Sequence, residues 1–202
     1  AFDEGMCALV EEIKPKVVSF HFGLPDPSLL SRVKAAGVRV ISSATTVREA
    51  RWLEENGCDA IIAQGYEAGG HRGMFLTKDI TAQAGTMALL PQVVDAVKVP
   101  VIAAGGIGDG RGFLAALALG AVGVQLGTRL ICTPEADGGQ WYKRMILETD
   151  EEGTIITKSL TGKTTRAFAT AEVRAYEAAR LSGATAADLK PYERAVRQGR
   201  KQ

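Results

Sequence analysis

Short apolar runs alternate with stretches of helical hydrophobic spacing from the start of the chain to about residue 134. The runs are rich in valine, isoleucine and alanine, and glycine, proline or polar residues follow them, which is typical of strands buried on both faces. They predict strands at residues 17–22, 38–42, 60–63, 100–104 and 122–126.

Capping residues mark the starts of the helices between these strands. Asp26 precedes Pro27, a pair that favours the first turn of a helix, and Gly37 favours its end. Thr46 and Glu49 have the spacing of a capping box, in which each side chain bonds the backbone amide of the other residue. With Asp109 as a further cap, the predicted helices cover residues 27–36, 47–56, 87–98 and 110–119.

The pattern changes after residue 134, where the chain becomes more helical and more charged. Helices are predicted over residues 140–148, 171–181 and 186–198, with a polar loop over residues 150–165. We therefore divide the chain into residues 1–134, an α/β part, and residues 135–202, a helical segment that packs on that part or extends from it.

Strands that alternate with helices predict parallel βαβ units and an α/β fold. The pattern contains five such units, and five units do not close a barrel of eight strands. Two arrangements fit this count. The sheet is either open and doubly wound, or part of a barrel whose other strands are not in this chain.

Composition limits the classes of partner. The 202 residues carry a formal net charge of +1, so no attraction to nucleic acid or to an anionic membrane is expected. Three well-separated cysteines indicate neither a metal cluster nor a disulfide framework, and favour the reducing cytoplasm. No apolar run is long enough to span a bilayer, and the first residues do not resemble a signal peptide.

The first candidate for chemistry is the loop after the third predicted strand, residues 64–73, with the sequence QGYEAGGHRG. Ligands bind where parallel strands end, and the glycines of this loop allow the backbone to approach a ligand closely. His71 can exchange protons near neutral pH, and Glu67 is a candidate to orient it. The alternative is a glycine loop that carries an exposed histidine and a solvated carboxylate.

Two further glycine turns follow the fourth and fifth predicted strands. Residues 104–112, AGGIGDGRG, lead into a helix whose first amides attract a phosphate, although their spacing fits neither a Rossmann nor a Walker motif. Gly127 and Thr128 close the next strand. Glycine turns after two consecutive strands form the phosphate site of many TIM barrels, so we predict an anion site here, with a simple tight turn as the alternative.

The second histidine, His21, lies within the first predicted strand, between two phenylalanines. A histidine in such a run is more often a core or barrel-lumen residue than a catalyst. The alternative, functional interpretation is that His21 lines the substrate pocket.

These residues together resemble the nitronate monooxygenase (2-nitropropane dioxygenase) family. The similarity rests on residues 19–25 (SFHFGLP), 64–73, 100–112 and 125–128 (QLGT). The string EAGGHRG is specific to this family, whereas residues 103–112 are shared with FMN-dependent enoyl-acyl-carrier-protein reductases. Arg72 and the residues that follow it favour the monooxygenases.

The resemblance implies a (β/α)8 TIM barrel that binds FMN where its strands end, with this chain supplying strands four to eight. His71 would be the catalytic base or the hydrogen-bond donor to the substrate. The residues implied to contact FMN are Gln64, Gly69, Gly70, Gly105, Gly106, Gln125, Leu126, Gly127 and Thr128.

The reaction implied is the oxidation of alkyl nitronates or nitroalkanes by O2 to a carbonyl compound and nitrite. Family members begin with three further βα units, so we expect a fragment, or a chain that receives the missing strands from a second copy or from another partner chain. Two alternatives stay open. One is an NAD(P)H-dependent FMN reductase of enoyl thioesters, and the other is a non-catalytic barrel remnant that binds a phosphorylated ligand.

Overall fold

A computed structural model describes residues 2–199 of the chain, and its contacts divide into two units. Unit 1 contains the chain up to Ala68 together with Gly73–Leu126. Unit 2 contains Gly69–Arg72 and the chain from Gly127 onward. The division expected after residue 134 therefore falls inside unit 2, and residues 200–202 of the expected C-terminal segment lie outside the described residues.

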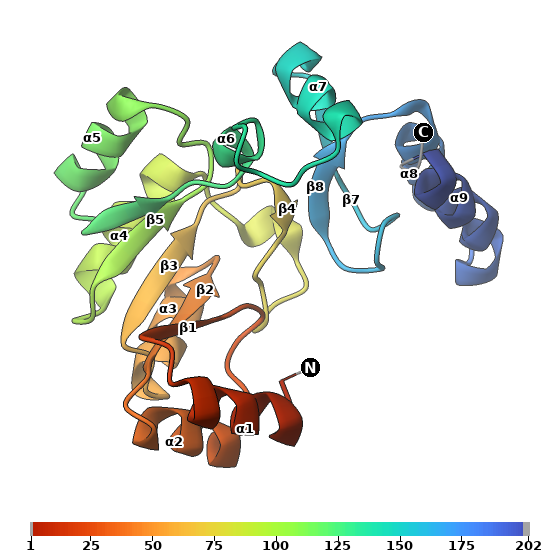
Figure 1. Ribbon diagram of the computed structural model, residues 1–202. Coiled ribbons are helices and arrows are strands. Elements are labelled where there is room, and N and C mark those ends of the chain that lie inside the picture. Colours follow the sequence, from red (N-terminus) through yellow and green to blue (C-terminus); the bar gives the residue numbers. More distant parts are fainter. Residues whose placement is uncertain (1, 200–202) are drawn as a thin grey trace. The chain divides into compact units, whose positions relative to one another are not determined.

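Unit 1 is built on a parallel sheet (Figure 1). Its strands are, in spatial order, β1 (Val17–Phe20), β2 (Arg39–Ala44), β3 (Ala60–Gln64), β5 (Val101–Ala104) and β6 (Gly123–Gln125). This order follows the chain without a reversal, whereas a doubly wound sheet reverses at a switch point. The sequence analysis left two arrangements open, a doubly wound sheet and part of a barrel. The structure has the second, part of a TIM barrel.

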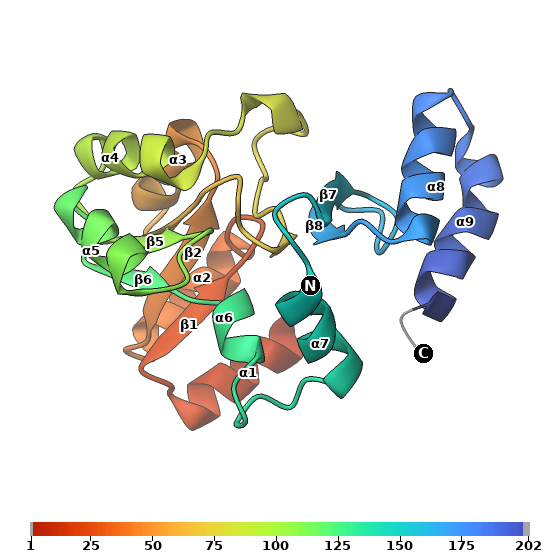
Figure 2. The ribbon, with the colours of Figure 1, turned by 90° about the horizontal axis from the view of Figure 1, so that it is seen from above.

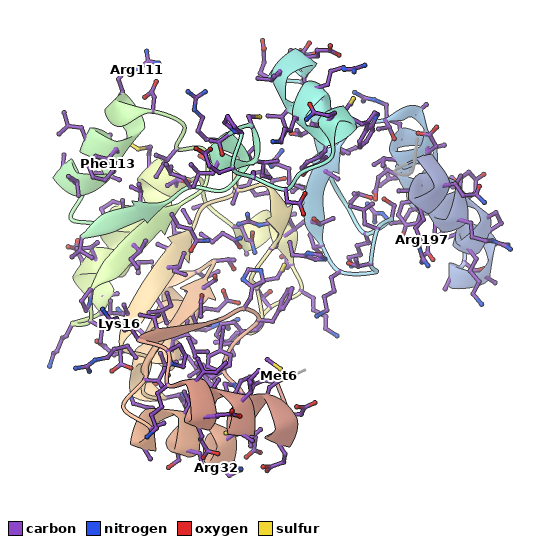
Figure 3. The ribbon with its side chains drawn as sticks, viewed as in Figure 1. Met6, Lys16, Arg32, Arg111, Phe113 and Arg197 are labelled. Carbon is purple, nitrogen blue, oxygen red and sulfur yellow. The ribbon has the colours of Figure 1, made fainter. Side chains whose placement is uncertain are left out.

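Helices connect these strands and cover the sheet. They are α1 (Glu4–Ile13), α2 (Pro27–Ala35), α3 (Val47–Glu55), the 3-10 helix η1 (Ile80–Ala82), α4 (Thr86–Ala96) and α5 (Gly110–Ala118). Helices α3 and α4 pack against each other and against β2, β3 and β5, as Figure 2 shows from above. The core between helices and sheet contains Val33, Val40, Leu53, Ile61, Leu90 and Val93, all with no exposed surface. On α5, Arg111 and Phe113 are exposed and point away from the sheet (Figure 3).

The predicted helix starts are confirmed, with one correction. The side chains of Asp26 and Asp109 accept hydrogen bonds from backbone amides of the first turns that they cap. Thr46 Oγ1 accepts one from Glu49 N at 3.2 Å. The reciprocal half of the capping box was predicted wrongly, because the Glu49 carboxylate accepts from the backbone and hydroxyl of Thr45, at 2.8 and 2.7 Å.

Helix α1 was not predicted from the sequence. Asp3 caps it by accepting a hydrogen bond from Met6 N at 3.0 Å. The helix packs on α2, where Arg32 donates to both carboxylate oxygens of Glu11 at 2.9 and 2.7 Å. Its buried residues, Cys7 and Val10, have helical spacing, so capping and periodicity were the available signals.

Unit 2 contains an antiparallel sheet and helices. The strands, in the order β4-β8-β7, are β4 (Gly70–His71), β8 (Thr165–Phe168) and β7 (Thr154–Thr157). The loop predicted over residues 150–165 is wrong, because the β-branched run of β7 pairs with β8. The predicted helices are confirmed as α7 (Gln140–Glu148), α8 (Ala171–Leu181) and α9 (Ala186–Gly199), and the short α6 (Thr128–Ile131) precedes them. None of the described helices combines the length and the apolar character needed to cross a bilayer.

Candidate functional site

The sheet of unit 1 brings several of the predicted site residues to one edge. The strand register places Gln64 beside Ala104, and Ala104 beside Gln125, where β3, β5 and β6 end. Gly105 and Gly106 follow β5 directly, and Leu126 follows β6. Because ligands bind at this edge in parallel α/β folds, the position agrees with the role predicted for these residues, which stays a prediction.

Gln64 closes the loop that leaves this edge. Its buried side chain accepts a hydrogen bond from Gly73 N to Oε1 at 2.7 Å. The chain passes into unit 2 at Gly69 and returns to unit 1 at Gly73, so this bond fixes the point of return. The sequence analysis predicted that Gln64 contacts FMN, and that contact stays a prediction. The hydrogen bond shows that Gln64 has a structural role in the loop.

His21 lies beyond β1 and not within it, which corrects the sequence prediction. The strand ends at Phe20 because Phe22 and Gly23 turn the chain with positive φ, 70° and 92°. His21 Nδ1 lies 3.1 Å from Ser43 Oγ, at the end of β2. A Cβ on Gly73 would lie 2.8 Å from the His21 ring, so only glycine fits there. His21 is thus part of the same edge of the sheet.

Thr86, which the sequence analysis missed, joins three segments at this edge. Its backbone amide and hydroxyl donate to the Glu67 carboxylate at 2.8 and 2.9 Å, and its hydroxyl lies 2.8 Å from the Gly105 carbonyl. The first turn of α4, the loop after β3 and the turn after β5 are therefore linked. Glu67, proposed from sequence as an orienting group for His71 or a solvated carboxylate, is bonded to this helix start. A threonine directly before the predicted helix was the available signal.

Gly105 and Gly106 form a turn that only glycine adopts readily. Their φ values are +113° and +70°. A Cβ on Gly105 would lie 3.0 Å from Ala68 N, and one on Gly106 would lie 3.1 Å from Glu67 Cβ. Among the described residues, neither backbone amide donates a hydrogen bond to a protein group. The turn therefore has the shape and the donors that a phosphate needs.

At the start of α5, where the sequence predicted that the first amides attract a phosphate, a protein carboxylate accepts from two of them. Asp109 Oδ1 accepts from Arg111 N at 2.9 Å and from Gly112 N at 3.4 Å. Hydrogen bonds from Arg111 lower the pKa of this carboxyl to about 2, so it is ionised near neutral pH. The negative charge of Asp109 therefore already caps the amides of this helix. In the turn before the helix, the amides of Gly105 and Gly106 are available to an anion.

Gly65→Ala is expected to destabilise unit 1 by about 1–3 kcal/mol, the usual cost of forcing a methyl group into a packed site. A Cβ at residue 65 would overlap the hydroxyl and backbone of Thr86. Gly108→Ala is the matched control, because its Cβ would meet nothing within 4 Å. Urea unfolding of both variants measures the difference, and equal midpoints would contradict the close packing of residue 65 against α4.

Glu49 is a second residue whose role the sequence did not reveal. Its side chain has no exposed surface, and its carboxylate accepts hydrogen bonds from Phe75 N at 2.7 Å and Leu76 N at 3.1 Å. With the two bonds from Thr45, it receives four. It therefore fixes the segment after Gly73 to the start of α3.

Unit 2 contains the other predicted site residues. A Cβ on Gly69 would lie 3.0 Å from Thr128 Oγ1, so these two positions are close together. Gly70 has a φ of 77° and leads into His71, which pairs with Thr165 of β8. Gly127 is the residue before α6. The residues predicted to bind one cofactor thus belong to two units of the chain.

His71 is half-buried on β4. Its Nε2 lies 2.7 Å from Thr161 Oγ1. Partial burial, and then the positive charge of Lys163, lower its pKa below the usual 6.5. The imidazole is therefore neutral near pH 7 and able to accept a proton. No three His, Cys, Asp or Glu side chains among the described residues gather as metal ligands would.

Comparison with known proteins identifies the class. The model of the nitronate monooxygenase family matches residues 2–201, so the chain belongs to this family. A protein named "Probable nitronate monooxygenase" from Staphylococcus aureus (strain Newman) is 49% identical over 151 residues, which cover 74% of this chain and 42% of that protein.

Two solved structures are similar. Nitroalkane oxidase from Streptomyces ansochromogenes has 41% sequence identity and a TM-score of 0.76, over 83% of this chain and 49% of that one. FabK from Thermotoga maritima has 34% identity and a TM-score of 0.77, over 90% of this chain and 55% of that one. The chain thus spans about half the length of the relatives that it matches.

Proposed function

We propose that the protein is an FMN-dependent oxidoreductase that converts alkyl nitronates, or nitroalkanes, and O2 to carbonyl compounds and nitrite. The observation that carries the proposal is His71, a half-buried imidazole with a lowered pKa on a strand that the family's EAGGHRG string forms. Membership of the nitronate monooxygenase family supports the reaction class.

The turn after β5 fits a flavin phosphate. Its two glycines have positive φ and leave little room for a Cβ, and their amides donate to no protein acceptor among the described residues. Gly105 and Gly106 would therefore hold the phosphate, while Gln64 and Gln125 stand at the same edge of the sheet. Bound FMN would supply the electron acceptor for the substrate and the means of passing electrons to O2.

His71 would act on the substrate in one of two ways. A neutral nitroalkane must lose its α-proton, and a neutral imidazole near pH 7 is a suitable base for it. An anionic nitronate has no proton to lose, and His71 would then donate a hydrogen bond to its negative charge. Partial burial of the ring strengthens either interaction because less water competes for it.

The test is the visible spectrum of the purified protein, followed by nitrite assay after addition of propionate 3-nitronate in air. Flavin absorbance with oxygen-dependent nitrite release is the expected result. A colourless protein that releases no nitrite would contradict the proposal and favour a barrel unit that binds a phosphorylated ligand.

The second candidate is an NAD(P)H-dependent reductase of enoyl thioesters. It is retained because residues 103–112 are similar to the glycine-rich string of the FMN-dependent enoyl reductases. Rapid mixing with NADH distinguishes the two. Fast bleaching of the flavin by NADH, without nitrite release from nitronates, would favour the reductase.

A further inference from the structure

A hairpin in unit 2 carries a residue that touches His71. Strands β7 and β8 are joined by a turn of residues 158–164, and the hydroxyl of Thr161 in this turn lies 2.7 Å from His71 Nε2. Thr161 is exposed, so packing of its own side chain does not hold it in place. The contacts that fix the turn therefore also fix the hydroxyl at the His71 ring.

A buried polar cluster ties one end of the turn to α8. Glu177 of α8 is 5% exposed, and its Oε1 accepts a hydrogen bond from Thr157 Oγ1 at 2.7 Å. Ser159 N donates to the same threonine oxygen at 3.0 Å, and Ser159 Oγ also lies 3.0 Å from it. Arg180 Nε donates to the other carboxylate oxygen, Oε2, at 2.7 Å. Thr157 and Ser159, which are both buried where β7 enters the turn, are thus attached to the helix.

The other end of the turn is held by the sheet. Arg72 N donates to Thr164 O at 3.0 Å, where the chain after β4 continues beside the start of β8. Within the turn, Lys163 N donates to Thr161 Oγ1 at 3.4 Å. Thr161 therefore lies between two attachments, one to β4 and one to Glu177 on α8.

The register of the three strands places the cluster and His71 in one row. Thr157 pairs with Thr165, and Thr165 pairs with His71. Residues opposite each other in antiparallel strands present their side chains on the same face of the sheet. Two strand spacings, about 10 Å, separate Thr157 from His71. With Thr165 between them, the influence of Thr157 on the ring passes along the turn.

Packing alone does not require polar residues in this cluster. Valine has the shape of threonine and suits a buried strand at least as well, and an apolar residue at position 177 would avoid the burial of a carboxylate. A buried polar network in which each atom has a partner specifies positions more than it adds stability. The cluster is therefore suited to setting where the turn lies.

We propose that Glu177 is a positioning residue for His71 and acts through Thr157, Ser159 and the turn that carries Thr161. The proposal rests on the proposed function, in which His71 removes the α-proton of a nitroalkane. A ring without this support keeps its chemistry but loses its alignment with the substrate. Misalignment of this kind lowers a rate by up to about 10²-fold.

The first test removes one hydroxyl from the middle of these contacts. Thr157→Val should lower kcat for nitroethane by roughly tenfold to a hundredfold. The KM should change by less than about threefold, because the alignment of the base matters in the transition state rather than in substrate binding. Thr157→Ser, which restores the hydroxyl, should recover kcat. Thr170→Val is the matched control, since it removes the threonine hydroxyl that caps the start of α8 and should leave kcat unchanged.

A double-mutant cycle tests whether the effect passes through Thr161. Thr161→Val alone should lower kcat as Thr157→Val does. If the two residues act in series, the double variant should be slower than Thr161→Val by less than about twofold. Losses that multiply in the double variant would overturn the inference, because Thr157 would then affect turnover by another route.

Variants of the helix test Glu177 itself. Glu177→Met should lower kcat as much as Thr157→Val, whereas Glu177→Gln keeps an oxygen for Thr157 and should lower it less. Arg180→Met removes the other partner of the carboxylate, a half-exposed one, and should change kcat by less than about twofold. An equal loss in Arg180→Met would contradict the assignment. If Glu177→Met does not fold, the Thr157 variants and the cycle decide.

A measurement without turnover separates this inference from the reaction. The chain has two histidines, so the ring nitrogen resonances of His71 can be assigned by NMR with the His71→Gln variant. Thr157→Val and Glu177→Met should shift the Nε2 resonance in the direction that Thr161→Val shifts it, and Arg180→Met should not. These shifts in a protein that oxidises no nitroalkane would keep the positioning role and overturn the proposed reaction. An unchanged Nε2 resonance in Thr157→Val would overturn the inference, whatever the turnover of that variant.

Discussion

Replacing His71 by glutamine is expected to lower the turnover of nitroethane by about 10²–10⁴-fold, the usual contribution of a general base. Glutamine keeps a polar side chain at this position but cannot accept the α-proton. Turnover of ethyl nitronate should fall less, because that substrate needs no proton removed. Steady-state nitrite release with both substrates measures the difference.

The control for this variant is the flavin spectrum, which should be unchanged if the substitution affects only the substrate. In the wild type, nitroethane turnover should decrease as the pH falls through the pKa of His71. Burial and the charge of Lys163 lower that pKa, so the decrease should occur below pH 6.5. Undiminished turnover in His71→Gln would remove His71 from the mechanism.

Glu49→Ala is expected to lower the free energy of unfolding by about 3–5 kcal/mol, because it leaves several buried donors without an acceptor. The four donors are the backbone amides of Thr45, Phe75 and Leu76 and the Thr45 hydroxyl. Since the buried carboxylate joins the start of α3 to the segment after Gly73, the loss should appear as lower global stability. Urea unfolding monitored by circular dichroism measures it.

Two variants sharpen this prediction. Glu49→Gln keeps the shape of the side chain but turns an NH2 group toward donors, so an intermediate loss is expected. Glu55→Ala removes an exposed glutamate from the same helix and should change stability by less than about 0.5 kcal/mol. If Glu55→Ala destabilises the protein as much as Glu49→Ala, the loss comes from α3 as a whole rather than from the buried carboxylate.

The parallel sheet of unit 1 could be predicted because its strands are apolar on both faces and its helices begin at strong caps such as Asp26 and Asp109. Strand β7 was missed because its short β-branched run is surrounded by charged and polar residues that are typical of a loop. His21 was placed inside a strand because the turn at Phe22 requires positive φ, which its sequence does not indicate.

The site could be predicted only in part. The chain has only two histidines, and its glycines gather in the turns that follow strands, so His71 and the turn at Gly105 were proposed from residue type and position. Their partners were not found, because threonine, serine and glutamate are common and the contacts join distant positions. Thr86 reaches Gly105 across 19 residues, and Ser43 reaches His21 across 22. Only the packed structure specifies those pairs.

The long separation between His71 and Thr161, 90 residues, has a consequence for protein synthesis. A ribosome that adds about 5–20 residues per second needs roughly 5–20 seconds between these two positions. During that interval most of the parallel sheet can form, but β4 has no neighbouring strand. A nascent chain that stops before Thr165 should therefore resist proteolysis over much of unit 1 while the peptide around His71 is still cleaved.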